Sequence, residues 1–126
     1  MIHHVAITSM FPERLSDFYQ GLPGIVKIRE NLENSVLRSV WFGFQGSDSI
    51  LMIERGESRS PHALVFDLRR LFSFSLDRNK VSVDMRYVIS LIESKTEYTF
   101  YFRDPDGNQL GYSAYPEKLS EYPLDL

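Results

Sequence analysis

The feature of this sequence that most constrains its fold is an order of elements that occurs twice. A β-branched run opens each half, a short helical pattern follows it, and three strand-like runs complete the half. The first half covers residues 1–56 and the second covers residues 62–114, with a linker at 56–61 and a tail at 115–126. The halves show no clear sequence identity, so only the pattern repeats.

Local signals place the elements of the first half. Residues 2–8 alternate as a strand, with His4 on one face. Pro12 suits the first turn of a helix, with Ser9 as its expected cap, and the glycines at 21 and 24 end that helix. Three strands are then expected at 25–29, 36–44 and 50–54, with polar turns at 31–34 and 45–48 between them.

The second half repeats this order with weaker signals. A strand is expected at 62–68, a short helix at 68–76, and three strands at 81–92, 97–103 and 109–113. The stretch 81–92 is apolar with weak periodicity, and we interpret it as a strand. A tight turn at 104–107, with Pro and Gly at suitable positions, joins the last two strands. The tail holds two prolines and is expected to be extended.

Two βαβββ units of this kind predict an α+β fold. They form a strongly curved mixed sheet with helices on its convex side and a cup on its concave side. A length of 126 residues fits one domain, and 43% hydrophobic with 25% charged residues is the balance of a globular protein. We therefore expect a single domain built from two modules.

Charge and cysteine content exclude several classes of function. The net charge is −3 and no basic block stands out, which argues against nucleic-acid binding. The absence of cysteine excludes disulfides, thiolate nucleophiles and cysteine-ligated metals. No apolar stretch reaches the length of a membrane span, and the first residues lack the pattern of a signal peptide. A cytoplasmic location is the expectation that follows.

Two stretches carry a resemblance to a known superfamily. One is the opening, His3-His4-Val5-Ala6-Ile7 followed by Phe18-Tyr19 and Gly21-Leu22-Pro23-Gly24; the other is Phe100-Tyr101-Phe102-Arg103-Asp104-Pro105-Asp106-Gly107-Asn108. They resemble the opening strand and helix and the closing hairpin of the vicinal oxygen chelate superfamily of glyoxalases, bleomycin-resistance proteins and extradiol dioxygenases. The resemblance implies the paired-module fold, a divalent metal or a small organic ligand in the cup, and a homodimer.

The superfamily's metal ligands stand on the first, fourth, fifth and eighth strands, and the resemblance maps them onto four positions here. They are His4, Met52, Ala63 and Gly111. Only His4 suits a divalent ion, because a thioether is a poor ligand for such ions and catalytic sites use about three protein ligands. We therefore expect a degenerate metal site and no cofactor.

An alternative keeps a metal through a shifted ligand set. If a bulge at Pro61 turned His62 inward, then His4, His62 and Glu54 would form a set of two histidines and one carboxylate, suited to Mn, Fe, Ni or Zn. Glu54 and Asp67 are also the acids left to act as a general base.

The remaining cup positions describe a largely apolar pocket. Trp41, Met52 and Ala63 would line it, His4 would add one polar point, and Gly43 and Gly111 would leave space. The expected function is binding of a small organic ligand, as in the drug-sequestering branch of the superfamily. The alternatives are a divalent-metal-dependent lyase, isomerase or dioxygenase, and a non-catalytic dimer with a filled cup.

Overall fold

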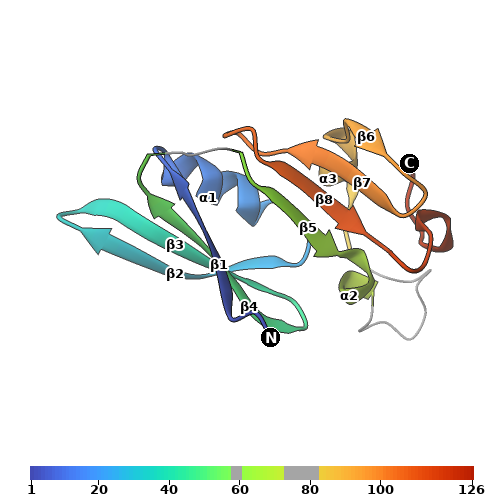
Figure 1. The fold of residues 1–126 in the computed structure, drawn as a ribbon, viewed down its shortest axis with the longest axis horizontal. Coiled ribbons are helices and arrows are strands. Elements are labelled where there is room, and N and C mark those ends of the chain that lie inside the picture. The colour runs from blue at the N-terminus through green and yellow to red at the C-terminus, as the bar shows by residue number, and fades with distance from the viewer. Residues whose placement is uncertain (58–60, 73–82) are drawn as a thin grey trace. The chain divides into compact units, whose positions relative to one another are not determined.

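The computed structural model describes residues 1–57, 61–72 and 83–126, and the chain divides into two compact units, Met1–His62 and Ala63–Leu126 (Figure 1). Each unit is built on one four-stranded mixed sheet. The strand orders are β1-β4-β3-β2 and β5-β8-β7-β6, so the same arrangement is used twice. The predicted pattern of paired modules is confirmed.

The described residues of unit one form one helix and four strands, which match the predicted order. They are β1 (His4–Ser9), α1 (Pro12–Gln20), β2 (Ile25–Glu33), β3 (Val36–Phe44) and β4 (Ser47–Arg55). β1 runs parallel to β4, and the other neighbours are antiparallel. β2 is longer than predicted, because the chain turns only at Asn34 and Ser35. Both have positive φ, at 51° and 63°, as a two-residue hairpin turn of type I′ requires.

Helix α1 begins at Pro12, as predicted, but its cap differs from the prediction. Phe11 is the N-cap residue, and no side chain caps the helix. Ser9 is instead the last residue of β1, and its hydroxyl accepts a hydrogen bond from the Phe11 backbone N–H at 3.0 Å. The prediction that Ser9 caps α1 was therefore wrong; Ser9 organises the turn that leads into the helix.

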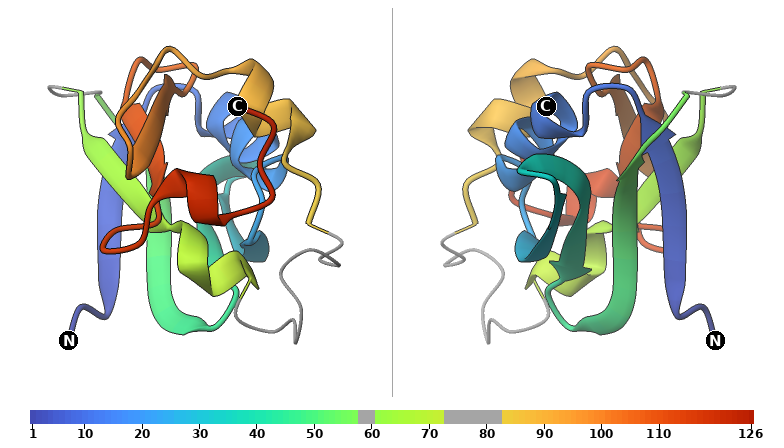
Figure 2. Two further views of the ribbon diagram at one scale, coloured as in Figure 1. Left: turned by 90° about the vertical axis from the view of Figure 1, so that its right-hand side faces the viewer. Right: turned by 90° about the vertical axis from the view of Figure 1, so that its left-hand side faces the viewer.

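The core of unit one lies between α1 and a single face of its sheet. α1 contacts all four strands and lies on one side of them (Figure 2). The side chains that meet there are almost fully buried: Ile7, Leu15, Tyr19, Val40, Phe42, Leu51 and Ile53. Along β1 and β4, buried residues alternate with less buried ones. The buried residues face α1, so the residues between them project from the opposite face of the sheet.

Unit two has the same strand order with shorter elements. They are β5 (Ala63–Asp67), α2 (Leu68–Phe72), α3 (Arg86–Ser90), β6 (Ser94–Lys95), β7 (Thr99–Arg103), β8 (Gln109–Ser113) and the 3₁₀ helix η2 (Leu119–Glu121). Its core lies on one face of the sheet and includes Leu68, Val88, Phe100, Phe102, Leu110 and Tyr112. In the residues that the structure describes, no helix is long and apolar enough to cross a membrane.

The strand predicted at 81–92 was wrong. Residues 86–90 form helix α3, and the second strand of the unit is the two-residue β6 further along. An apolar run with weak periodicity does not by itself separate a strand from a buried helix. Asp84 favours the helix, because its carboxylate accepts a hydrogen bond from the Arg86 backbone N–H at 3.0 Å. Residues 81–82, and residues 73–76 of the predicted second helix, lie outside the described part of the chain.

The tail is folded against unit two and is not fully extended as predicted. It contains η2, and Leu119 and Tyr122 are buried. The ring of Tyr122 lies 5.2 Å from that of Phe72, centroid to centroid. The tail therefore completes the core of its own unit.

The turn predicted between β7 and β8 is confirmed. Asp104 is buried, and its carboxylate accepts hydrogen bonds from the backbone N–H groups of Asp106 and Asn108, both at 2.9 Å. Its second oxygen accepts a bond from the Asn108 side chain at 2.8 Å. Gly107 has a φ of 85°, which favours glycine. The closing motif of the resemblance is therefore a turn-forming device.

Candidate functional site

The face of sheet one opposite α1 collects most of the predicted site residues, and we call it the open face. Register partners on neighbouring strands share a face, so the ladders arrange these side chains in rows. From β1 to β2 the rows are His4, Ile50, Gly43 and Val26; Ala6, Met52, Trp41 and Arg29; and Thr8, Glu54, Ser39 and Asn31. His4, Trp41 and Met52 are thus brought to one face, as predicted.

The middle row is apolar and aromatic. Trp41 lies between Met52 and Arg29, and the Arg29 guanidinium carbon lies 5.3 Å from the centre of the indole ring. Trp41 is half-buried, and its Nε1 is buried without a hydrogen-bond partner in the described part of the chain. Such a row offers a flat apolar surface with a cation at one end.

The next row is polar. The Asn31 side-chain nitrogen donates to the Ser39 hydroxyl at 2.8 Å, and the Thr8 hydroxyl donates to the Glu57 backbone carbonyl at 2.9 Å. Glu54 is half-buried between them, and its carboxylate makes no hydrogen bond or ion pair with any residue that the structure describes. The row therefore holds one uncommitted acid beside the aromatic row.

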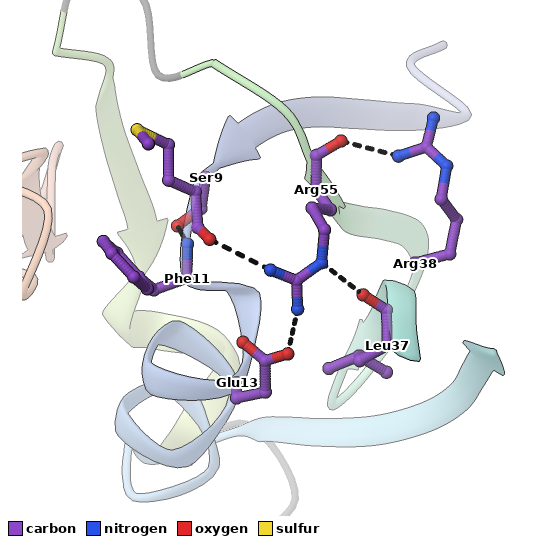
Figure 3. A network of polar contacts seen from close by, with 7 residues as sticks. Ser9, Phe11, Glu13, Leu37, Arg38 and Arg55 are labelled. Atoms are coloured by element: carbon purple, nitrogen blue, oxygen red, sulfur yellow. Dashed lines mark hydrogen bonds and ion pairs between the residues drawn. The ribbon is translucent and has the colours of Figure 1, made fainter. Parts of the chain in front are cut away.

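Figure 3 shows how the end of β4, which carries Glu54, is held in place. Arg55 follows Glu54 and donates to the backbone carbonyls of Leu37 at 2.9 Å and Met10 at 3.1 Å, and it forms an ion pair with Glu13 of α1. Alternation places Arg55 on the helix side of the sheet and Glu54 on the open face. This network ties β4 to β3 and to the start of α1, and our sequence analysis missed it.

The space expected at Gly111 is absent. A Cβ built there would lie 2.9 Å from the Phe100 carbonyl oxygen and 3.1 Å from the Tyr101 ring. At Gly43 an added Cβ would lie 3.4 Å from the Ile28 side chain, which is an ordinary van der Waals contact. Gly111 therefore permits close approach of β7 and leaves no room for a side chain, whereas the space predicted at Gly43 stays a prediction.

Ala63 lies on the exposed face of sheet two with Val65 and Gly111. Val65 pairs with Gly111 across β5 and β8, and its side chain is exposed. His62 directly precedes β5. If the alternation of the strand extends to it, His62 lies on the same face as Leu64 and on the opposite face from Ala63. The two predicted positions would therefore differ in the face of sheet two to which they belong.

His4 and Glu54, the two potential metal ligands on the open face, lie too far apart to share a divalent ion. His4 pairs with Ile50 and Glu54 pairs with Thr8, so the two potential ligands stand four residues apart along parallel strands. That separation is about 13 Å at the usual rise of a strand, and side chains stand roughly perpendicular to a sheet. No three His, Cys, Asp or Glu side chains of the described residues are grouped so that they could hold a metal ion. The shifted set with His62 stays a prediction.

Asp67 is engaged in a structural contact at the end of β5. Its carboxylate accepts hydrogen bonds from the Arg69 backbone N–H at 3.0 Å and from the Arg69 guanidinium at 2.9 and 3.0 Å. Burial raises the pKa of Asp67, but these bonds from Arg69 outweigh it and hold the pKa below its usual value. An acid held in this way orients the start of α2 and is poorly suited to act as a general base.

Several solved structures share the fold of this chain at low sequence identity. The antibiotic-binding protein TnmS3 from Streptomyces sp. CB03234 superposes with a TM-score of 0.60 at 16% identity, over 90% of this chain and 93% of that one. Lactoylglutathione lyase from Agrobacterium tumefaciens gives 0.60 at 15% identity, over 89% and 91% of the two chains. The fosfomycin resistance protein FosX from Mesorhizobium loti gives 0.61 at 16% identity, over 96% and 94%.

The chain has the glyoxalase fold. This confirms the fold that the two sequence motifs implied, that of the vicinal oxygen chelate proteins. In sequence alone, no family model and no curated protein matches the chain. Proteins with this glyoxalase fold include enzymes and binding proteins, so function has to be argued from the site.

Proposed function

We propose that this glyoxalase-fold protein binds a small organic ligand on the open face of sheet one and does not use a catalytic divalent ion. The observation that carries the proposal is the row of Ala6, Met52 and Trp41, an apolar surface bordered by a few polar groups. Ligand sites typically combine such a surface with a small number of orienting polar side chains. TnmS3, which has a similar fold, is an antibiotic-binding protein.

Exposure of apolar side chains on the same face supports this proposal. Val26 is 58% exposed and Ile28 is 52% exposed, and they flank Gly43. Covering apolar surface is favourable by roughly 25 cal/mol per Å². A flat ligand laid on Trp41 and Met52 would also cover these two side chains, and this gain favours occupancy.

His4 is the polar residue to test first. It is exposed at the edge strand of the open face, and its ring contacts His3 through Nδ1 at 3.0 Å. His4→Ala should therefore weaken ligand binding severalfold and leave the melting temperature nearly unchanged. Small molecules retained in native mass spectra, followed by a thermal-shift screen of aromatic compounds and antibiotics, would supply the ligand for that comparison. A large loss of stability with unchanged affinity would contradict the role of His4.

A metal-dependent lyase, isomerase or dioxygenase using His4, His62 and Glu54 is the competing function. Elemental analysis of protein purified without chelator and then offered Mn, Fe, Ni, Zn and Co separates the two proposals. Near-stoichiometric metal that is lost in both His4→Ala and Glu54→Gln would overturn metal-free binding. Metal at background level would support it.

We also propose that the protein is a homodimer, as small members of the superfamily commonly are. A third possibility, a dimer whose cup is filled by side chains, predicts a dimer in light scattering with no retained molecule and no hit in the screen. The ligand-binding proposal predicts a retained molecule or a hit, whatever the oligomeric state.

A further inference from the structure

A β-bulge in β2 brings Arg29 onto the open face. The register between β2 and β3 shifts between Lys27 and Arg29, so Ile28 is the additional residue. Ile28 lies beside Gly43, and Arg29 lies opposite Trp41 with its guanidinium over the indole ring. Regular alternation would have placed Arg29 on the same face as Lys27. The bulge thus adds a cation to the aromatic row.

Two contacts hold the guanidinium in place, and a third fixes its partner Asn31. Nε of Arg29 donates to the Asn31 side-chain oxygen at 2.7 Å, and the Asn31 nitrogen donates to the hydroxyl of buried Ser39 at 2.8 Å. The ring of Trp41 supports it from below. These contacts use Nε and one face of the planar group, which leaves the two terminal nitrogens for another acceptor.

Arg29 also differs from the other basic residues on the strands of sheet one. Lys27 pairs with Glu30 at 2.7 Å, Arg38 lies 3.8 Å from Glu33, and Arg55 pairs with Glu13. Arg29 has no acidic partner among the residues that the structure describes. An exposed guanidinium that is held by neutral groups and lacks a counter-charge is preorganised for an anion from solution.

We propose that Arg29 is the anion-recognition group of this site, and that the ligand carries a carboxylate on a flat apolar body. The terminal nitrogens of a guanidinium form a fork that matches the two oxygens of a carboxylate. The apolar body would lie beside it on Trp41 and Met52. This inference rests on the proposed ligand-binding function and names the class of ligand.

Glu54 lies on the same face but on β4, two strands from Arg29. Two strand spacings amount to about 10 Å, so Glu54 does not neutralise Arg29 directly. Its charge opposes an anion weakly, which makes Glu54→Gln an informative control. Removing this acid should strengthen carboxylate binding slightly.

The experiment compares matched carboxylates and carboxamides with the full-length protein. The probes are benzoate, 2-naphthoate and anthracene-2-carboxylate, each with its neutral amide. Trp41 is the single tryptophan of the chain, so its indole N–H gives one NMR cross-peak that reports on this face. Each probe is titrated into the wild type, Arg29→Gln and Lys27→Gln. Lys27→Gln removes the same charge from the same strand, but on the opposite face.

We expect at least one carboxylate to shift the Trp41 cross-peak, with affinity that falls as NaCl is added. Arg29→Gln should weaken that binding about tenfold or more, since charge-assisted hydrogen bonds are lost. Lys27→Gln should leave it unchanged, and the amides should bind both variants as they bind the wild type.

Two different failures have different meanings. If carboxylates and amides bind equally well and Arg29→Gln changes neither, the open face binds ligands but the role of Arg29 is wrong. If none of the six compounds perturbs the cross-peak in the wild type, the binding site on the open face is overturned together with the inference built on it.

Discussion

At the scale of single residues, glycines show why side-chain identity alone does not reveal a pocket. The absence of a side chain at Gly111 and Gly43 suggested space for a ligand. The structure instead places Tyr101 and a backbone carbonyl against the first position, whereas at the second only Ile28 lies near, at an ordinary contact distance. Whether a glycine opens a cavity or permits close packing depends on residues distant in sequence.

Gly111→Ala should therefore be clearly destabilising. Its Cβ would lie 2.9 Å from a backbone oxygen of β7, which moves only if the strand moves. Overpacking of this kind lowers the free energy of unfolding by about 1–3 kcal/mol. Urea unfolding of the variant and the wild type would measure the difference. Gly43→Ala is the matched control, because its nearest neighbour is the Ile28 side chain at 3.4 Å, which can shift. Equal stabilities of the two variants would show that the strand at Gly111 adapts.

The crowding at Gly111 also affects whether the missing metal ligand could be restored by mutation. Gly111 stands where the resemblance places the superfamily's last-strand glutamate, so Gly111→Glu would restore the motif in sequence only. The added side chain has to displace the Tyr101 ring and the β7 backbone.

At the scale of elements, bulges and caps decided what the sequence pattern did not reveal. His4, Met52 and Trp41 lie on one face, as alternation predicts, because the pairing of β1, β4 and β3 is regular around these three residues. Arg29 was missed because a bulge changes the face to which it projects, and nothing in the residue types of β2 marks that bulge. Helix α3 was missed because its apolar run has no clear period.

The network around Arg55 is the element-scale feature most open to measurement. Its guanidinium satisfies two backbone carbonyls and pairs with Glu13, which joins β3, β4 and α1 (Figure 3). Arg55→Gln should lower the free energy of unfolding by about 1–2 kcal/mol, because two backbone carbonyls lose their hydrogen-bond donor. The ion pair with Glu13 adds little, since both side chains are partly exposed to solvent.

Arg38→Gln provides the comparison for this network. Arg38 donates to the Arg55 carbonyl but has only a distant acidic partner, so its loss should cost less. A cost for Arg38→Gln equal to that for Arg55→Gln would show that the backbone contacts of Arg55 do not stabilise the unit.

At the scale of the whole molecule, the order of elements and the two motifs sufficed to predict the glyoxalase fold. The turn motif around Asp104 is specified locally, since three of its hydrogen bonds lie within five residues. The site was less predictable, because its rows depend on register between strands and on a bulge. Local features such as this turn can be predicted from one sequence. The face of a sheet on which a side chain lies depends on strand pairing, which forms only in the folded structure.

The proposal that the protein binds no catalytic divalent ion has a consequence for its stability. A protein that binds a metal only in its folded state is stabilised by that metal, and chelation lowers its melting temperature. Here the buried side chains of both cores are mainly apolar, and His4 and Glu54 stand about 13 Å apart along their strands. EDTA should therefore leave the melting temperature of protein purified without chelator unchanged, and added Mn or Zn should not raise it. A drop of several degrees with EDTA that is reversed by one metal, and that is absent in His4→Ala, would show that the shifted ligand set forms.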